Sequence, residues 1–193
     1  PLILIWTLYI FSAIFSQVIL TKEKSKLLDL ATKDGLTGLY VIRHFREIMN
    51  QVLLQAHESG ENISIILTDI DNFKQINDTF GHDGGDAVLR EVAERMKAGL
   101  RNTDTIGRFG GEEFLALIPN CAGEELLRIA ERIRSSVNRP VQTESQLIPV
   151  SCSIGLAVRW DMNDGTIQEA LQRSDKALYV AKEMGRNRVV SAW

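Results

Sequence analysis

The apolar and polar positions divide the chain into three parts. Residues 1–20 are largely apolar and contain no charged side chain, residues 21–33 are charged and free of proline and glycine, and residues 34–193 alternate between helical and strand-like patterns. We therefore expect an N-terminal helix, a helical linker and one compact domain, since about 160 residues are a common domain size. Because the chain begins with Pro1 and not with methionine, we expect it to be part of a longer protein.

The first apolar segment is long enough to cross a membrane. As a helix, its 20 residues would span roughly 30 Å, the thickness of the hydrocarbon core of a bilayer. Lys22, Lys24 and Lys26 follow directly, and positive residues mark the cytoplasmic side. The segment therefore predicts an anchor in the inner (cytoplasmic) membrane, with the rest of the chain in the cytoplasm. A buried or dimer-forming helix of a soluble protein is the alternative.

The linker carries one apolar stripe at helical spacing, formed by Leu20, Leu27, Leu30 and Ala31. This spacing suits a short parallel coiled coil that joins two copies of the protein. It suits a single amphipathic linker helix equally well, because it covers too few heptads to separate the two.

The part of the chain that begins at residue 34 mixes helical and strand-like segments. Because their order combines αβ crossovers with one hairpin, we expect an α/β sandwich in which helices cover a mixed sheet. We also expect a bulge at Gly155. The expected helices are residues 40–57, 87–100, 124–137 and 167–184, and the expected strands are residues 63–70, 105–109, 113–118, 148–159 and 188–191.

Composition narrows the class of protein. The chain is 45% hydrophobic and 24% charged, as globular proteins are. Its net charge of -3 offers no basic surface for nucleic acid. Cys121 and Cys152 are the two cysteines, and no Cys/His spacing indicates a zinc site. Both lie in apolar surroundings, so we expect buried thiols in a reducing cytosol.

The most informative stretch is Arg-Phe-Gly-Gly-Glu-Glu-Phe at residues 108–114. Gly110 and Gly111 lie between two apolar segments and predict a tight hairpin, because glycine readily adopts positive φ. Glu112 and Glu113 would then lie at the hairpin tip, where a backbone without Cβ atoms lets a ligand come close. An exposed turn with solvated glutamates is the alternative.

A second pair of carboxylates lies at the end of the first buried strand. Asp69 ends that strand and Asp71 follows with the same parity, at the kind of strand end where open α/β sheets bind ligands. A hairpin paired beside this strand would bring Glu112 and Glu113 to Asp69. Three carboxylates and a backbone carbonyl form a hard oxygen site for Mg²⁺ or Mn²⁺. Two such ions, about 4 Å apart, would hold the attacking and leaving oxygens of a phosphoryl displacement.

The polar, glycine-containing segment 72–86 links that strand to a helix. Asn77 and Asp86 carry the groups that guanine recognition requires, since an amide donates to O6 or N7 and a carboxylate accepts from N1–H and N2–H. Such pairing rejects adenine, because a mismatch leaves buried polar groups unpaired. Asp86 is also placed to be the N-cap of a helix that starts near Ala87.

Taken in order, these motifs resemble the GGDEF domain, the catalytic module of diguanylate cyclases. The resemblance covers residues 34–193 and implies a palm-like nucleotidyl cyclase fold, in which helices flank a mixed central sheet. Phe109 stands where tyrosine is common, which loses a hydroxyl and keeps the ring. The matching motifs are Asp34–Leu39, Asp69–Lys74, Asn77-Asp78, Gly81-His82 with Gly85-Asp86, the signature Arg108–Phe114 in its Gly-Gly-Glu-Glu-Phe form, and Ala181-Lys182 with Gly185–Asn187.

The resemblance implies that two GTP molecules become cyclic di-GMP and two pyrophosphates. Each subunit of a homodimer would hold one GTP, and the 3′-hydroxyl of one GTP would attack the α-phosphate held by the other subunit. Asp69 and Glu112 would bind metal through carboxylates and Ile70 through its carbonyl, with two Mg²⁺ or Mn²⁺ ions in each site. Glu113 would be a further metal ligand or would help to deprotonate the 3′-hydroxyl, and which glutamate is the base stays open.

The resemblance also implies nucleotide contacts. Asn77 and Asp86 would bind guanine, and a set of aromatic and basic residues would line the phosphates. For the two basic residues near the C-terminus, a solvated last helical turn is the alternative. The phosphate-lining set is Phe73, Lys74, Lys182 and Arg186, and His82 would support the nucleotide loop.

Arg101 and Asp104 stand just before the signature and match the RxxD inhibitory site of the family. There they would bind cyclic di-GMP, because arginine stacks on guanine and pairs with its Hoogsteen edge. The resemblance therefore implies product inhibition, with a second inhibitory arginine on the helix from Arg128 to Arg134.

Two other functions stay open. One is a catalytically inactive GGDEF domain that acts as a regulator binding cyclic di-GMP or GTP, and the other is a different nucleotidyl cyclase on the related palm-like fold. Inactive members of the family lack the signature glutamates or the strand-end aspartate, whereas Asp69, Glu112 and Glu113 are all present here. The products formed from GTP and from ATP would separate these functions.

Overall fold

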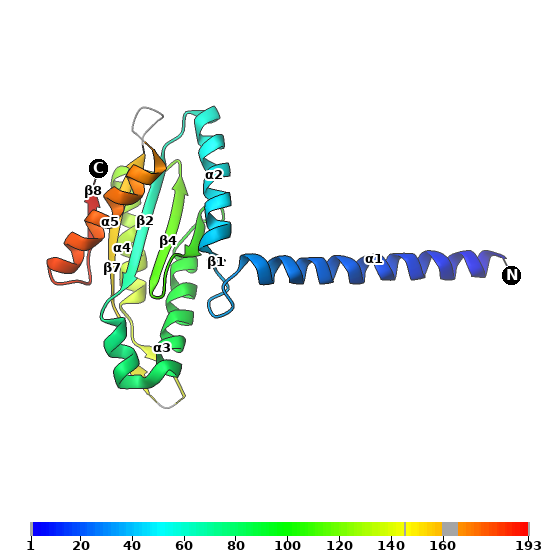
Figure 1. The fold of residues 1–193 in the computed structure, drawn as a ribbon, viewed down its shortest axis with the longest axis horizontal. Helices are drawn as coiled ribbons and strands as arrows, with labels where there is room; N and C mark the ends of the chain where they lie inside the picture. Colours follow the sequence, from blue (N-terminus) through cyan, green and yellow to red (C-terminus); the bar gives the residue numbers. More distant parts are fainter. Residues whose placement is uncertain (1, 145, 160–165, 193) are drawn as a thin grey trace.

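The computed structural model describes residues 2–144, 146–159 and 166–192, with the backbone alone for residues 2–13, 25 and 26. A mixed sheet of six strands has helices on both faces, and one long helix projects away from it (Figure 1). The helices are α1 (Leu2–Thr32), α2 (Ile42–Ser59), α3 (Phe73–Ala98), α4 (Gly123–Val137) and α5 (Ile167–Glu183). The strands are β1 (Tyr40–Val41), β2 (Ile63–Ile70), β3 (Thr105–Arg108), β4 (Glu113–Pro119), β5 (Val141–Gln142), β6 (Leu147–Ile148), β7 (Cys152–Arg159) and β8 (Val189–Ala192).

The main sheet has the strand order β1-β3-β4-β2-β7-β8, and β5 pairs with β6 in a separate small sheet. The central strand β2 is antiparallel to both β4 and β7, whereas β1 with β3 and β7 with β8 are parallel pairs. Helices cover both faces, so every residue of β2 is buried, which explains its unbroken apolar pattern. The predicted α/β sandwich with a mixed sheet is confirmed.

Alternation along the strands separates two hydrophobic cores. Ile66 and Phe114 belong to the core that includes side chains of α3 and α4. Leu67 and Leu115 point the other way and belong to the core that includes Phe45 of α2 and residues of α5. Side chains two residues apart on a strand share a face. The carboxylates that follow Leu67 and precede Leu115 by two positions therefore lie on the face covered by α2 and α5.

The segment 72–86, expected to be a link between strand and helix, is itself helical. Helix α3 begins at Phe73 and runs to Ala98, with a kink at Gly81, where φ is 74° and ψ is 169°. Phe73 and Ile76 are buried in the core, and this tertiary burial stabilises a helical turn that the polar composition conceals. Asp86 lies well inside the second half of α3, so the alternative that it caps a helix is wrong.

The predicted bulge at Gly155 is also wrong. Gly155 pairs in regular register with Leu67 of β2. A Cβ atom at this position would lie 2.1 Å from the carbonyl oxygen of Ser174 and 2.5 Å from the backbone nitrogen of Leu178. Glycine is needed there because the backbone of α5 approaches β7 too closely for any side chain.

Helix α1 contains the segment expected to cross a membrane. Among the residues whose side chains the structure describes, no helix is both long enough and apolar enough to span a bilayer. The side chains of residues 1–13, which make up most of the expected span, lie outside the described residues. The membrane anchor over residues 1–20 therefore stays a prediction from the sequence, and so do the linker at residues 21–33 and the boundary at residue 34.

We predict that Gly155→Ala lowers the free energy of unfolding by about 1–3 kcal/mol, because the new methyl group must displace α5. Denaturant titration of the variant and the parent chain measures this difference. Gly35→Ala is the matched control, since a Cβ atom there meets no atom within 4 Å. Equal stability of the two variants would contradict the close approach of α5 to β7.

Candidate active site

The predicted hairpin is present between β3 and β4. Arg108 pairs with Phe114, and the backbone N–H groups of Phe109 and Gly110 both donate to the carbonyl oxygen of Glu113, at 2.8 and 3.3 Å. The turn therefore contains Gly110 and Gly111, as the glycine pair predicts. Glu113 is the first residue of β4, and its position in the sheet is fixed by these bonds.

The hairpin carries both signature glutamates to the end of β2. Asp69 and Glu113 are register partners on the neighbouring strands β2 and β4. One residue further, the N–H of Ile70 donates to the carbonyl oxygen of Glu112 at 3.2 Å. Side chains of directly opposed residues lie about 5 Å apart at Cβ. The structure thus brings Asp69, Glu112 and Glu113 together, as the sequence predicts.

Arg108 ties the hairpin to the first turn of the domain. Its guanidinium donates to the carbonyl oxygen of Gly111 at 2.6 and 3.2 Å, and to Asp34 at 3.0 Å. Asp34 also accepts the backbone N–H and the hydroxyl of Thr37, at 2.9 and 2.7 Å. A planar guanidinium suits such a double contact. Both residues belong to the motifs that carry the family resemblance, but the motifs alone did not reveal that they touch.

Asp69 is only 6% exposed and forms an ion pair with Lys182 of α5, with 2.8 Å between carboxylate oxygen and Nζ. Burial raises the pKa of Asp69, and the hydrogen bond and charge of Lys182 offset part of that rise. The positive charge of Arg186 acts on Asp69 in the same direction as Lys182. Lys182, in the last turn of α5, is therefore placed at the carboxylates, whereas Arg186 is exposed and acts on Asp69 through its charge.

The signature glutamates lie in an unfavourable electrostatic position. Burial and the neighbouring charge of Asp69 raise the pKa of Glu112, and the same two causes raise the pKa of Glu113. Asp175 of α5 adds further negative charge beside Glu113. The site therefore concentrates negative charge that a bound cation would offset.

The donor set of this site suits a hard divalent cation. Mg²⁺ binds through one or two carboxylates and completes its shell with waters and substrate phosphates, so it does not require an all-protein cage. Within the described parts of the chain, no three His, Cys, Asp or Glu side chains lie close enough together to hold a metal ion by themselves. Asp69, Glu112 and Glu113, with the carbonyl of Ile70, offer oxygen ligands alone, which fits Mg²⁺ or Mn²⁺.

The two expected guanine contacts lie on either side of the kink in α3. Asn77 lies before Gly81 and Asp86 after it, and the side-chain oxygen of Asn77 lies so close to Gly85 that a Cβ there would approach it to 1.9 Å. Asp86 is half-exposed and lies 3.9 Å from Arg90. The amide of Asn77 therefore fills the space beside the backbone of Gly85, the residue that precedes Asp86.

The remaining expected nucleotide contacts differ in exposure. Lys74 and His82 are exposed, at the start of α3 and just after its kink. Phe73, expected to line the phosphates, is 8% exposed and packs in the core beneath the site. Exposed cations are available to a ligand, whereas the ring of Phe73 acts mainly by supporting the first turn of α3.

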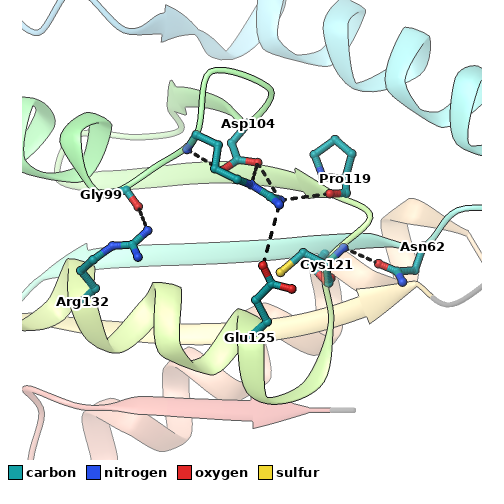
Figure 2. Close-up of polar contacts among 9 residues, drawn as sticks. Asn62, Gly99, Asp104, Pro119, Cys121, Glu125 and Arg132 are labelled. Carbon is teal, nitrogen blue, oxygen red and sulfur yellow. Dashed lines mark hydrogen bonds and ion pairs between the residues drawn. The ribbon is translucent and has the colours of Figure 1, made fainter.

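Arg101 and Asp104 form an ion pair at 3.2 Å, and Figure 2 shows the polar contacts around Asp104. Asp104 accepts from the backbone N–H and the guanidinium of Arg101 at 2.8 and 3.2 Å, and the same guanidinium donates to the carbonyl of Pro119 at 3.2 Å. Glu125 of α4 lies 3.9 Å away. The guanidinium of Arg101 is thus held by three neighbours while still 40% exposed.

Helix α4 places one more arginine beside this loop. Arg132 donates to the carbonyl oxygen of Gly99 at 2.6 Å, just before Arg101 (Figure 2). The sequence located a second arginine only to the stretch from Arg128 to Arg134. Arg128 pairs with Glu124 on the exposed side of the same helix, so Arg132 is the member that faces the loop.

Asp71 is a residue to which the sequence assigned no role beyond its shared parity with Asp69. Its carboxylate is buried and accepts hydrogen bonds from Ser151, Ser153 and the backbone of Asn187. Its partners lie 80 or more positions away, so no local pattern could have indicated them.

Comparison with known proteins places this arrangement in a family. The family model described as "Diguanylate cyclase, GGDEF domain" matches residues 31–188. The chain is 39% identical over 184 residues to diguanylate cyclase A of Treponema denticola, which covers 93% of this chain and 49% of that protein. It is 43% identical over 166 residues to the response regulator PleD of Caulobacter vibrioides, which covers 84% of this chain and 36% of that protein. The chain thus spans half or less of the length of these relatives.

Solved structures of the same family have the same fold. The coiled coil and GGDEF domain of DgcB from Caulobacter crescentus, in complex with c-di-GMP, matches with a TM-score of 0.84 and 31% identity, over 94% of this chain and 96% of that chain. The diguanylate cyclase SiaD from Pseudomonas aeruginosa, in complex with its activator SiaC, matches with a TM-score of 0.81 and 34% identity, over 92% of this chain and 68% of that chain.

We predict that Glu113→Gln raises the thermal unfolding midpoint at pH 7.5 without divalent metal by roughly 2–4 °C, because it removes one of the crowded charges. The raised pKa of Glu113 sets the direction in which this stability difference changes with pH. Above the pKa that Glu113 has in the folded state, its ionised carboxylate lowers the stability of the fold. That stability returns as the pH falls from this raised pKa to the ordinary pKa of a glutamate. The gain of the variant should therefore vanish near pH 4.

The matched control is Glu94→Gln, which changes an exposed glutamate on α3. Addition of Mg²⁺ should raise the midpoint of the parent chain more than that of Glu113→Gln. A midpoint difference that is the same at pH 7.5 and pH 4 would contradict the electrostatic origin of the effect.

Proposed function

This chain belongs to the diguanylate cyclase GGDEF-domain family, and on that basis we propose that it condenses two GTP molecules into cyclic di-GMP with release of two pyrophosphates. The observation that carries the proposal is the pairing of Asp69 with Glu113 across β2 and β4, with Glu112 beside them and Lys182 on the same carboxylate. Acids and a lysine that converge in this way suit a metal-bound triphosphate. The relatives that carry the name diguanylate cyclase extend beyond this chain, so the activity is proposed for the domain.

In the proposed reaction, the 3′-hydroxyl oxygen of one GTP attacks the α-phosphorus of the other. A new P–O bond forms, the bond to the pyrophosphate oxygen breaks, and the hydroxyl proton passes to a base. The reciprocal attack of the second 3′-hydroxyl on the other α-phosphorus closes the ring and releases the second pyrophosphate. Glu113 supports this role because its raised pKa makes its carboxylate a better proton acceptor than an ordinary glutamate. Glu112 is the other candidate, and its pKa is raised by the same causes.

Asp69, the carbonyl of Ile70 and Glu112 are the proposed metal ligands, with Glu113 as a further one. Two Mg²⁺ or Mn²⁺ ions in each site would neutralise charge on the phosphates and on the attacking oxygen. Lys182 lies 2.8 Å from Asp69, so its ammonium supplies positive charge at the place where the phosphates would bind. Arg186 and the exposed Lys74 would extend that positive surface along the triphosphate.

Guanine is the proposed base because of the amide and carboxylate on the two halves of α3. Asn77 would donate to O6 or N7, and Asp86 would accept from N1–H and N2–H. The close packing of Asn77 on Gly85 supports a rigid position for the amide. His82, exposed just after the kink, would support the nucleotide loop from the open side.

The reaction needs two copies of the domain, because one copy offers one set of carboxylates and one base-recognition site. We propose a homodimer in which α1 joins the two copies, and the solved relative that contains a coiled coil together with its GGDEF domain supports this arrangement. Attachment of α1 to the cytoplasmic membrane stays a prediction from the sequence.

The decisive experiment incubates the dimeric chain with GTP and Mg²⁺, and in parallel with ATP, and identifies the products by chromatography. We expect cyclic di-GMP and pyrophosphate from GTP alone. Glu112→Ala should lower the rate about 10²-fold or more, because it removes a carboxylate from the reacting centre. Glu124→Ala, on an exposed part of α4, is the control and should keep the parent rate.

Absence of cyclic di-GMP at every enzyme concentration would overturn the proposal. Binding of cyclic di-GMP or GTP without turnover would then favour a regulator on the same fold. A product formed from ATP would favour another nucleotidyl cyclase, and full activity of Glu112→Ala would contradict the metal assignment.

We further propose that Arg101 and Asp104 bind cyclic di-GMP and give product inhibition, with Arg132 as the second arginine. The partly exposed guanidinium of Arg101 beside the α4 arginine supports this surface. Arg101→Ala should raise the concentration of cyclic di-GMP that halves the rate by about tenfold or more, as loss of an arginine–guanine pair does. Arg128→Ala, on α4 like Arg132 and paired with the exposed Glu124, is the control for a general loss of charge. Inhibition that is unchanged in Arg101→Ala would contradict the site.

A further inference from the structure

Asp71 joins three parts of the chain at the edge of the carboxylate site. It is 4% exposed and lies two residues after Asp69. Its carboxylate accepts from the hydroxyls of Ser151 and Ser153 at 2.7 and 2.6 Å and from the backbone N–H of Asn187 at 3.0 Å. Its own N–H donates to the carbonyl of Ser151 at 2.9 Å. A buried carboxylate with three donors is fully satisfied, so this side chain is not available as a ligand.

The turn that Asp71 holds has an unusual backbone. Gly185, Arg186 and Asn187 all have positive φ, at 106°, 63° and 45°. Residues with a Cβ atom avoid this region, and two in succession are rare. Such a conformation persists only where the surroundings fix it, and it is typical of functional sites. The bond from Asn187 to Asp71 is the contact that fixes the last of these residues to β2.

Helix α4 holds the same turn from the other side. Arg134 donates to the side-chain oxygen of Asn187 at 2.8 Å and approaches its backbone carbonyl at 3.5 Å. Arg134 is itself oriented by Glu131, one turn earlier on α4, at 2.8 Å. Asp71 therefore binds the backbone N–H of Asn187 and Arg134 binds its side-chain oxygen, so the turn is held from two sides.

This turn controls where Arg186 lies. The residue follows the last turn of α5, which carries Lys182, and its own N–H donates to the carbonyl of Ala181 at 3.0 Å. Arg186 is exposed and makes no ion pair with any described residue, although its positive charge acts to lower the pKa of Asp69. An arginine that is fixed at its backbone and free at its tip suits an anionic ligand.

We propose that Asp71 is a positioning residue, which fixes the turn from Gly185 to Asn187 and thereby places the guanidinium of Arg186 on the triphosphate of the nucleotide. The inference rests on the proposed function in one respect, namely that GTP binds at the carboxylates of β2 and β4. Asp71 touches neither the nucleotide nor the reacting atoms. It acts through the backbone of Asn187, and it therefore differs in role from Asp69, two residues earlier.

A purely structural role would give a different result from a positioning role. If Asp71 only joined β2 to the segment before β7, its loss would weaken the fold and leave the relative affinities for different nucleotides unchanged. If it positions Arg186, its loss weakens binding in proportion to the phosphates that the ligand carries. The test therefore compares 3′-deoxy-GTP, which lacks the attacking hydroxyl and cannot react, with GMP, which lacks the two outer phosphates.

Calorimetry with Mg²⁺ measures both affinities for the whole chain. Asp71→Ala should lower the affinity for 3′-deoxy-GTP by roughly tenfold, the loss expected when one charge-assisted contact is misplaced. The same variant should lower the affinity for GMP by less than about twofold, because the outer phosphates make most of the contact with Arg186. Asp71→Ser, whose shorter side chain does not reach Asn187, should give the same pattern if the alanine variant is poorly folded.

Two further variants separate position from stability. Asp71→Asn should keep the parent affinities, because its amide oxygen still accepts from Asn187 and its NH₂ group can donate to Ser153. Ser153→Ala removes one bond to the same carboxylate without touching the turn, so it should lower the unfolding midpoint and leave the ratio of the two affinities unchanged.

A double-mutant cycle with Arg186→Ala completes the test. If Asp71 acts through Arg186, the double variant with Asp71→Ala binds 3′-deoxy-GTP no more weakly than Arg186→Ala alone. Additive losses, or an unchanged affinity ratio in both Asp71→Ala and Asp71→Ser, would overturn the inference. A parent chain that binds no 3′-deoxy-GTP would instead refute the proposed function, so the two failures are distinguishable.

Discussion

The pairing of β2 with β4 is the constraint on which the rest of the site depends. Their antiparallel register sets Asp69 opposite Glu113 and continues as a hydrogen bond from Ile70 to Glu112. A shift by one residue would turn Glu113 to the opposite face and bury it among the apolar side chains of α3 and α4. The alternation that builds two cores therefore also decides on which face of the sheet Asp69 and Glu113 lie.

The register of β2 with β4 places several carboxylates close together, and the positive charges of the protein neutralise them only in part. Burial raises the pKa of Asp69 and of the neighbouring glutamates, and Lys182 is the one cation paired directly with Asp69 among the described residues. Lys182 reaches the site because α5 packs closely on β7 at Gly155. Crowded carboxylates of this kind lower the stability of a fold, as groups kept for function commonly do.

Departures from regular helix occur on both sides of these carboxylates. Gly81 interrupts α3 between Asn77 and Asp86, and the turn after α5 has positive φ through Arg186 and Asn187. Asn77 packs on Gly85 across the kink in α3, and the turn after α5 is bound to Asp71 through Asn187. Irregular backbone that the surrounding fold fixes in one position is a common means of orienting polar groups toward a ligand.

The sequence alone determined the features that depend on short-range pattern. The buried strand β2, the glycine hairpin and its glutamates could all be predicted, because alternation, β-branching and glycine pairs act over a few residues. Tertiary structure decided the rest. The helical start of α3 depends on burial of Phe73, the need for Gly155 depends on α5, and Asp71 finds its partners 80 or more positions away. These features are set by contacts between distant segments, which no local spacing encodes until the chain has folded.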